Sequence, residues 1–420
     1  MNDHGSAAPP PADRPNLVTV DALWTGDGFA GPTALSIGDG ILHAITADRA
    51  AHAVGRGASP VDRERIDAPG VLHLGGTLIP SLTDHHTHLG LSDPAALFRG
   101  GITHAVDLGW IPAVAAGWLP DRPDRPAIAI AGALLTAPGG YPVTAGWAPP
   151  GASKEVGGPR EAVNAVQEQV MTGASRIKVA LNSDAGETVD DVTLSAIVEE
   201  SHATGLPVVA HTQGAGQAAR AVRAGVDQLA HTPFSERLDD SLLAEAAEAG
   251  MSWISTLDIH GWGTYTASFR LAVDNLRRFA ARGGRVLYGT DLGNGDLPVG
   301  VNARELAAIR QAGLDGPALI RTIAGSPTHA DSASASASAA GAGAAATVAL
   351  GPRIAWIPSV PPADPGRLPG WLATARGLFV SDLASPAPAP ATQTATQTGT
   401  AATNTAAAPT DRTTLRQEHP

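Results

Sequence analysis

Eight short apolar runs alternate with longer amphipathic stretches between residues 81 and 324, and this rhythm most limits what the chain can fold into. The runs are LTDHH, ITHAVDLG, AIAIAGA, ASRIKVAL, LPVVAH, VDQLAH, SWISTLD and RVLYGTD. Eight strand–helix units in about 240 residues are typical of a (β/α)8 TIM barrel. A doubly wound open sheet is the alternative, but no GxGxxG turn supports it.

Start and stop signals place helices between several of these runs. Thr188 with Asp191 three positions later predicts a helix start, and Gly205 predicts its end. Pro159 predicts the first residue of another helix, because proline fits the first turn of a helix. We expect the buried face of the Thr188 helix to hold three apolar side chains, Val192, Ala196 and Ile197.

The segments on either side of the barrel have a different character. Residues 16–80 and 347–382 contain short β-type runs, which predict the two parts of a small β-sandwich. Gly38-Asp39-Gly40, between two apolar runs, predicts a hairpin turn. Three further segments are rich in small or polar residues and are expected to be disordered or to act as a linker: 1–15, 331–346 and 383–420. The barrel would then occupy residues 81–330.

The charge balance and the absence of cysteine exclude several kinds of protein. A formal net charge of −12 gives no electrostatic footprint for nucleic acid or for an anionic membrane. Without cysteine, neither a disulfide framework nor a thiolate metal site can form. The start of the chain lacks the pattern of a secretory signal. We therefore expect a cytoplasmic protein that binds a small molecule, and leave open whether it forms a homo-oligomer.

Three histidines occur together in the first barrel strand, in the segment PSLTDHHTH. Alternate residues of a strand share a face, so His86 and His88 would point the same way and could chelate a metal ion. The alternative is that the histidines belong to a polar loop. Asp84 beside them is expected to orient the strand or a ligand rather than to bind metal.

Four other strands end in a potential metal ligand: Lys178, His211, His231 and Asp291. Each has an ordinary structural explanation, but all of them fall at the carboxyl ends of predicted strands, where barrel active sites are built. Lys178 is one of only two lysines, beside 26 arginines (28 − 2). An amine at this position is therefore a specific choice, because lysine can lose its proton and react whereas arginine cannot.

In this order, the HxH pair, the lysine, the two histidines and the aspartate resemble the amidohydrolase superfamily, closest to its imidazolonepropionase-like and prolidase-like members. PVVAHTQGAGQAARAVRAGVDQLAHTPF is similar to the family block that runs from the fifth to the sixth strand, and LIPSLTDHHTH resembles its HxH strand. GITHAVDLG and ISTLD resemble its second and seventh strands. The resemblance extends from about Leu17 to Ala324.

The resemblance implies a centre of two divalent ions, most simply zinc because the ligands are nitrogen and oxygen. It implies that His86, His88 and Asp291 hold one ion, that His211 and His231 hold the other, and that Lys178 bridges them as a carbamate. A hydroxide bridging the ions would attack an amide or cyclic amide carbonyl, and Asp291 would act as the general base. The implied activity is hydrolysis of carbon–nitrogen bonds other than peptide bonds.

Substrate contacts are expected in the loops after the strands, at Tyr141, His260 and Tyr265. Two alternatives to a binuclear hydrolase remain open. One is a mononuclear deaminase or imidazolone-type hydrolase, whose relatives carry an acidic residue three positions after the fifth-strand histidine. Here that position is Gly214. The other is a catalytically inactive binding member of the family.

Overall fold

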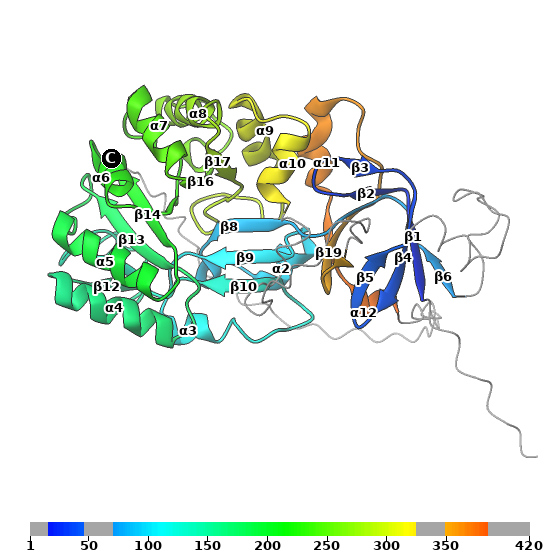
Figure 1. Ribbon diagram of the computed structural model, residues 1–420, viewed down its shortest axis with the longest axis horizontal. Helices are drawn as coiled ribbons and strands as arrows, with labels where there is room; N and C mark the ends of the chain where they lie inside the picture. Colours follow the sequence, from blue (N-terminus) through cyan, green and yellow to red (C-terminus); the bar gives the residue numbers. More distant parts are fainter. Residues whose placement is uncertain (1–15, 46–69, 325–348, 385–420) are drawn as a thin grey trace, which may run out of the picture.

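Two parallel sheets lie at the centre of the computed structural model, which describes residues 16–45, 70–324 and 349–384 (Figure 1). The smaller sheet has the order β10-β9-β8, and the larger has the order β12-β11-β13-β14-β15-β16-β17. Their strands are β8 (Thr83–Thr87), β9 (His104–Asp107), β10 (Ala127–Ile130), β11 (Leu134–Thr136), β12 (Ser153–Glu155), β13 (Ile177–Asn182), β14 (Val208–Gln213), β15 (Gln228–Leu229), β16 (Ser252–Ile254) and β17 (Arg285–Leu287). Each of the eight predicted runs contains a strand, and β11 and β12 are additional.

Backbone hydrogen bonds connect the two sheets at both of their ends. Just beyond β17, the nitrogen of Asp291 donates to the carbonyl of His86 in β8 at 2.8 Å. Just before β13, the nitrogen of Ser175 donates to the carbonyl of Ile130 in β10 at 2.9 Å. The fold is therefore mixed α/β with parallel sheets that meet, although the strands of the described residues do not pair as one closed sheet.

A separate buried cluster takes its side chains from strands of both sheets and from the residues that follow them. Its members are Val106, Leu108, Ala131, Val209, Ala230, Ile254 and Leu287. Most apolar side chains of the connecting helices belong to a second, larger cluster. The strands thus bury apolar side chains on both faces, which explains why they read as apolar runs rather than as alternating patterns.

The helices follow the strands and flank the sheets (Figure 1). They are α2 (Pro94–Arg99), α3 (Pro112–Ala116), α4 (Pro159–Met171), α5 (Asp191–Ala203), α6 (Gln217–Arg223), α7 (Asp240–Glu248), α8 (Ala267–Ala280), α9 (Ala303–Gln311) and α10 (Pro317–Ile323), with short 3-10 turns η2 (Leu89–Leu91) and η3 (Asp258–His260). The predicted start of α4 at Pro159 is confirmed. Its buried residues Ala162, Ala165, Val166 and Gln169 repeat at helical spacing and face the sheets.

The predicted helix after Thr188 exists as α5, but two details of the prediction are wrong. The N-cap is Asp190, whose carboxylate accepts from the nitrogen of Thr193 at 2.8 Å, whereas Thr188 accepts from Arg220. Val192, expected on the buried face, is 67% exposed. The buried face of α5 is formed by Thr193, Leu194, Ile197, Val198 and Ser201, so packing leaves Val192 on the solvent side.

Two five-stranded sheets combine chain segments from before and after the parallel sheets. One has the order β18-β5-β4-β1-β6 and the other β20-β19-β7-β2-β3. Their strands are β1 (Leu17–Val20), β2 (Ala22–Trp24), β3 (Phe29–Ala30), β4 (Thr33–Gly38), β5 (Ile41–Ala44), β6 (Val71–His73), β7 (Thr77–Ile79), β18 (Ala349–Leu350), β19 (Arg353–Ile357) and β20 (Arg376–Phe379). Leu350 pairs with Leu42, and Trp356 pairs with Leu78.

Both of these sheets contribute to one buried cluster, which includes Leu35, Leu78 and Ile354. The predicted hairpin is confirmed: β4 pairs with β5 across Asp39 and Gly40, whose φ angles are +52° and +76°. A two-residue turn with both φ angles positive matches the right-handed twist of the strands. The proposed domain boundaries at 80 and 330 stay a prediction.

The C-terminal part also contains η4 (Pro365–Arg367), α11 (Leu368–Leu372) and α12 (Val380–Leu383). The predicted loose segments 1–15 and 331–346 lie outside the described residues, as does the predicted tail from 385 onward. Leu383, expected in that tail, is instead buried in α12 against the neighbouring sheet cluster.

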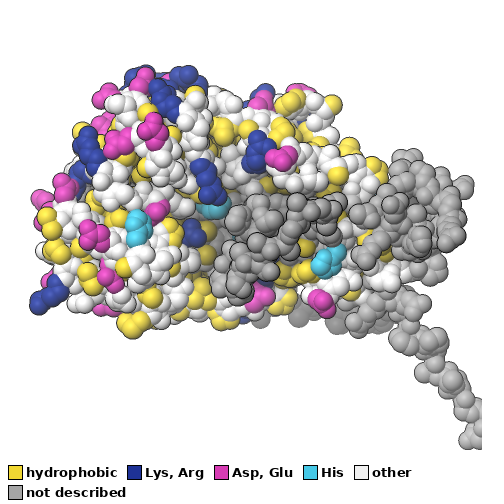
Figure 2. All heavy atoms as spheres, viewed as in Figure 1, with side chains coloured by type: hydrophobic (Ala, Val, Ile, Leu, Met, Phe, Trp, Pro, Cys, Tyr) yellow, Lys and Arg dark blue, Asp and Glu magenta, His cyan; other side chains and the backbone are white. Residues whose placement is uncertain are grey.

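Within the described part of the chain, no helix has the length and apolar character needed to cross a membrane. On the face shown in Figure 2, basic and acidic side chains are interspersed. The expected cytoplasmic location and the oligomeric state stay predictions.

Candidate metal centre and active site

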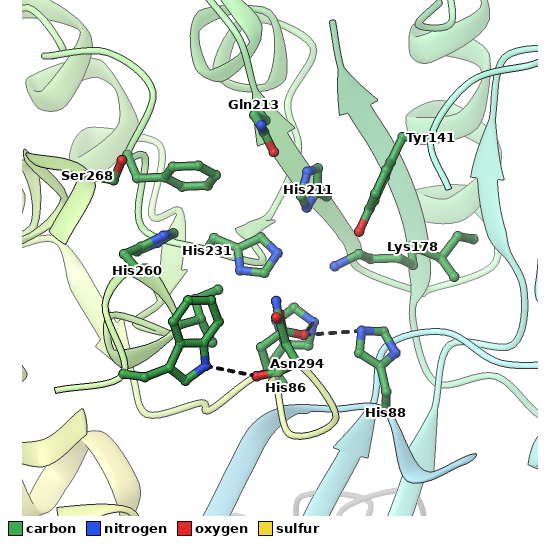
Figure 3. A pocket seen from close by; sticks show the side chains of 15 residues that line it. His86, His88, Tyr141, Lys178, His211, Gln213, His231, His260, Ser268 and Asn294 are labelled. Carbon is green, nitrogen blue, oxygen red and sulfur yellow. Dashed lines mark hydrogen bonds and ion pairs between the residues drawn. The ribbon is translucent and has the colours of Figure 1, made fainter. Parts of the chain in front are cut away.

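One cavity of about 590 Å³ lies at the carboxyl ends of the parallel strands, and all six predicted metal ligands line it (Figure 3). His86 lies in β8 and His211 in β14, while His88, His231 and Asp291 follow β8, β15 and β17. Lys178 is the second residue of β13 rather than at its carboxyl end, where it was predicted, because the strand continues to Asn182. The convergence of these residues follows from topology, because parallel strands end at the same edge of a sheet. The lining residues are His86, His88, Leu134, Tyr141, Lys178, His211, Gln213, His231, Phe234, Ile259, His260, Trp262, Ser268, Asp291 and Asn294.

The two histidines of the HxH pair are each oriented by a backbone carbonyl. The Nδ1 atom of His86 lies 2.9 Å from the carbonyl oxygen of Ala230, and Nδ1 of His88 lies 3.1 Å from that of Gly109. A carbonyl only accepts, so Nδ1 carries a proton in both rings and Nε2 faces the cavity. Burial alone would lower the pKa of His88, but Asp291 and Asp107 raise it above its usual value. His85, directly before His86 in the sequence, does not line the cavity.

Asp291 faces both of these histidines. Its Oδ1 atom lies 3.0 Å from Nε2 of His86 and 3.2 Å from Nε2 of His88, while Oδ2 accepts from the amide of Asn294 at 2.9 Å. Burial alone would raise the pKa of Asp291, but His86, His88 and His231 together hold it well below its usual value. The carboxylate is therefore ionised at neutral pH.

The Nε2 atom of His86 is buried and has no hydrogen-bond partner among the described residues. Burial lowers the pKa of His86 to about 4, so the ring is neutral at pH 7. Two groups that can only accept, the Nε2 lone pair and the carboxylate, thus face each other at 3.0 Å. A metal ion bound by both groups would relieve this repulsion.

His231 and His211 are the other two histidines among the predicted metal ligands. Their rings lie 4.8 Å apart, and the His231 ring lies 4.7 Å from that of His86. Ligand atoms of His86, His231 and Asp291 all lie within 4.8 Å of one another, close enough to hold one ion. Burial holds the pKa of His231 well below its usual value, which keeps the imidazole neutral and able to coordinate.

Lys178 reaches into the cavity from β13 with only 1% of its surface exposed (Figure 3). Among the described residues, its amine has no hydrogen bond or ion pair. Burial lowers the pKa of Lys178 from 10.5 to about 7, against the opposing effect of Asp291 and Asp107. A large fraction of this amine is unprotonated near neutral pH, the form that can react as a nucleophile. Lys154, the other lysine, forms an exposed ion pair with Glu168.

Asp84 lies behind the metal-ligand candidates and binds the backbone that carries them. Its Oδ1 accepts from the nitrogens of His86 (3.0 Å) and Thr290 (3.1 Å), and its Oδ2 accepts from the hydroxyl of Thr290 at 2.6 Å. It therefore joins β8 to the residue before Asp291. Asp84 does not line the cavity, in keeping with the orienting role expected for it.

The three predicted substrate residues are placed differently. Tyr141 and His260 line the cavity from opposite sides (Figure 3). Tyr265 does not line it; the side chain is 62% exposed and its hydroxyl accepts from Gln311 at 3.2 Å. Tyr141 stacks on His211 with ring centroids 4.9 Å apart, and its hydroxyl accepts from Nε1 of Trp147 at 3.1 Å.

Several cavity residues were not identified from the sequence. Gln213 and Asn294 could have been predicted from their spacing to a candidate ligand. Gln213 is two positions after His211 and so shares its face of β14, and Asn294 is three positions after Asp291. No sequence pattern could have identified Phe234 and Trp262, because they lie in irregular loops. Only the packing of those loops brings them to the cavity.

Comparison with known proteins supports the fold. No protein-family model matches the sequence, and a comparison with curated proteins finds no match. Among solved structures, A. niger ochratoxinase is similar with a TM-score of 0.63 at 18% identity, covering 86% of this chain and 93% of its own. Molinate hydrolase has a TM-score of 0.61 at 14% identity, covering 91% and 100%. A Xaa-Pro dipeptidase has a TM-score of 0.56 at 18% identity, covering 73% and 86%.

These neighbours are hydrolases by their descriptions, and a bottromycin amidohydrolase at 20% identity is similar over 89% of both chains. The likeness covers the parallel sheets and extends over most of the chain. The chain has the fold of the amidohydrolase and prolidase-like structures.

Proposed function

We propose that this chain is a member of the amidohydrolase superfamily that hydrolyses an amide or cyclic amide bond with two divalent metal ions. The observation that carries the proposal is the buried Nε2 lone pair of His86, which faces the ionised carboxylate of Asp291 at 3.0 Å. Four further donors line the same cavity. A nitrogen and oxygen donor set of this kind suits zinc, with manganese or cobalt as alternatives.

In this proposal His86, His88 and Asp291 hold one ion and His211 and His231 hold the other. Lys178 would supply a further anionic ligand as a carbamate, formed when its unprotonated amine adds to carbon dioxide and releases a proton. The low pKa and the absence of a partner within the described part of the chain support this role, because an amine buried alone is unfavourable unless it is modified or paired. When bound, the ions would acidify a water molecule and polarise the substrate carbonyl.

Asp291 is the proposed general base. Asn294 holds one carboxylate oxygen, which leaves the other directed at His86 and His88. The carboxylate accepts a proton from the attacking water as the carbon–oxygen bond forms. It then passes that proton to the leaving nitrogen as the carbon–nitrogen bond breaks. Tyr141 and His260 are the proposed substrate contacts on the two sides of the reacting carbonyl.

We propose that the parallel strands form a (β/α)8 barrel, with a β-sandwich built from residues 16–80 and 347–382. The buried cluster shared by strands of both sheets supports this, because a barrel encloses a layer of side chains from all around. The hydrogen bonds that connect the sheets at both ends support it as well.

The mononuclear alternative needs an acidic side chain at position 214. Gly214 has a φ of +93°, and a Cβ atom there would lie 2.0 Å from the hydroxyl of Ser183. The backbone therefore has neither the conformation nor the space for a carboxylate at this position. This favours the binuclear centre, whose fourth strand supplies Lys178 instead.

Metal analysis together with a substrate screen tests the proposal. The purified protein should contain close to two divalent ions per chain and, loaded with zinc, should hydrolyse members of a panel of lactams, hydantoins, N-acyl amines and N-acyl amino acids. A chain that is fully active with one ion would contradict the binuclear centre. A chain that binds two ions but cleaves none of these bonds would favour the inactive binding member.

A further inference from the structure

An aromatic and apolar wall lines one side of the cavity. It consists of Phe234, after β15, and of Ile259, His260 and Trp262, in and after η3. The rings of Phe234 and His260 pack against each other with centroids 4.1 Å apart. His260 lies across the cavity from Tyr141 and Lys178 (Figure 3). A flat apolar group bound in the cavity would therefore contact this wall.

The backbone of Trp262 has an unfavourable conformation. Its φ angle is +45°, a left-handed conformation that is rare for a bulky residue. Its backbone nitrogen donates to the carbonyl of Asp258 at 2.7 Å, and its indole Nε1 donates to the carbonyl of Asn294 at 3.2 Å. The indole also packs against Gly295, where a Cβ atom would lie 2.6 Å from Nε1. The residue as a whole nevertheless remains 38% exposed.

This arrangement joins the two loops that face the substrate. Trp262 binds the backbone of Asn294, and the side chain of Asn294 binds Asp291. The indole of Trp262 is fixed by the hydrogen bond of its Nε1 and lines the same cavity as Asp291. Such a ring is suited to binding a ligand.

Away from the proposed metal ions, the described residues that line the cavity offer no arginine to a substrate carboxylate. Among the described residues that line it, Lys178 is the only basic side chain apart from histidine, and none is arginine. Arg304, close to the same loop, is engaged: its Nε lies 3.0 and 2.9 Å from the two carboxylate oxygens of Asp258. A substrate carboxylate that lies away from the metal ions would lose its hydration without a charged partner, which weakens binding.

We infer that the substrate is an uncharged amide that carries an aromatic ring, and that Trp262 is the residue that selects for this ring. This inference rests on the proposed hydrolase function and names its substrate class. Gln213, Ser268 and Asn294 supply the neutral polar groups that would orient such a substrate. A dipeptide or another substrate with a free carboxylate is disfavoured.

Matched substrate pairs and matched tryptophan variants test the inference. The pairs are 4-nitroacetanilide with 4-acetamidobenzoate, and N-propylbenzamide with N-benzoylglycine; N-propylacetamide serves as the amide without a ring. Binding to the zinc-loaded protein is measured by calorimetry, and hydrolysis is measured separately. The variants are Trp262→Ala and Trp262→Phe. Trp356→Phe is the control, because Trp356 also donates its indole hydrogen to a backbone carbonyl, that of Gly75 at 3.1 Å, but in β19.

The uncharged member of each pair should bind at least about tenfold more tightly than its carboxylate partner. Trp262→Ala should weaken binding of the ring-bearing amides about tenfold, Trp262→Phe should retain most of it, and neither should change binding of N-propylacetamide. Equal binding of the carboxylates, or a loss with Trp262→Ala no larger than with Trp356→Phe, would overturn the inference. If the binding pattern holds but no amide is cleaved, the hydrolase proposal fails and the ligand class stands.

Discussion

The Nε2 atom of His86 and the Oδ1 atom of Asp291 lie 3.0 Å apart, although both are acceptors in the protonation states that their surroundings favour. The histidine proton is held on Nδ1 by the carbonyl of Ala230, 2.9 Å away. The two residues are 205 positions apart (291 − 86) in the sequence. The backbone hydrogen bond from the nitrogen of Asp291 to the carbonyl of His86 fixes their approach.

Asp291→Asn should leave metal binding largely intact and lower kcat by roughly 10²- to 10⁴-fold, because an amide cannot accept the proton in the transition state. The exposed Asp296→Asn, in the same loop, is the control. Metal content by elemental analysis and turnover of a cleaved amide are measured for both. Undiminished turnover in Asp291→Asn would exclude it as the base.

Lys178→Arg should abolish the bridge between the ions, since a guanidinium keeps its proton and cannot form a carbamate. We expect metal content to fall below one ion per chain and activity to be lost. Lys154→Arg should change neither, because Lys154 lies in an exposed ion pair. A Lys178→Arg protein with two ions and normal turnover would exclude a carbamate.

Tyr141→Phe should keep the ring that stacks on His211 and remove only the hydroxyl. The hydroxyl accepts from Trp147, so its own proton is available to a substrate oxygen in the cavity. Removing one such donor should lower kcat/KM by roughly 10- to 10³-fold with metal content unchanged. Equal kcat/KM in the variant and the parent protein would assign the tyrosine a packing role alone.

Glu305→Gln should change how stability depends on pH. Burial raises the pKa of Glu305 from 4.5 to about 7, and one of its carboxylate oxygens has no hydrogen-bond partner among the described residues. Between these values the folded protein binds the proton more tightly than the unfolded chain. The contribution of Glu305 to stability is therefore fully present below pH 4.5 and is lost as the pH rises through 7.

The variant has no charge to bury, so its stability relative to the parent should rise by an amount on the order of 3 kcal/mol between pH 4.5 and 8. Urea unfolding at several pH values measures this difference. The exposed Glu248→Gln is the control. A constant difference between Glu305→Gln and the parent across this range would contradict the raised pKa.

The sequence was most informative where a signal is local. The apolar runs located all eight expected strands, since burial on both faces of a parallel strand requires continuous apolar residues. The turn at Asp39 and Gly40 was equally readable, because few residues tolerate two successive positive φ angles. The N-cap of α5 could not be predicted, because Thr188 and Asp190 are both good N-cap residues. In the structure Arg220 binds the hydroxyl of Thr188, and Asp190 caps the helix.

The sequence alone determined which strands carry the candidate ligands, since that depends on local apolar patterns, but it placed Lys178 too near the end of its strand. It identified the six candidate ligands and showed that a lysine, rather than an arginine, lies among them. Only the tertiary structure decided that His86 faces Asp291 through a lone pair, that Tyr265 points to solvent and that Trp262 enters the cavity wall. Those relationships depend on loop packing and on contacts across hundreds of residues, which local patterns in the chain do not encode.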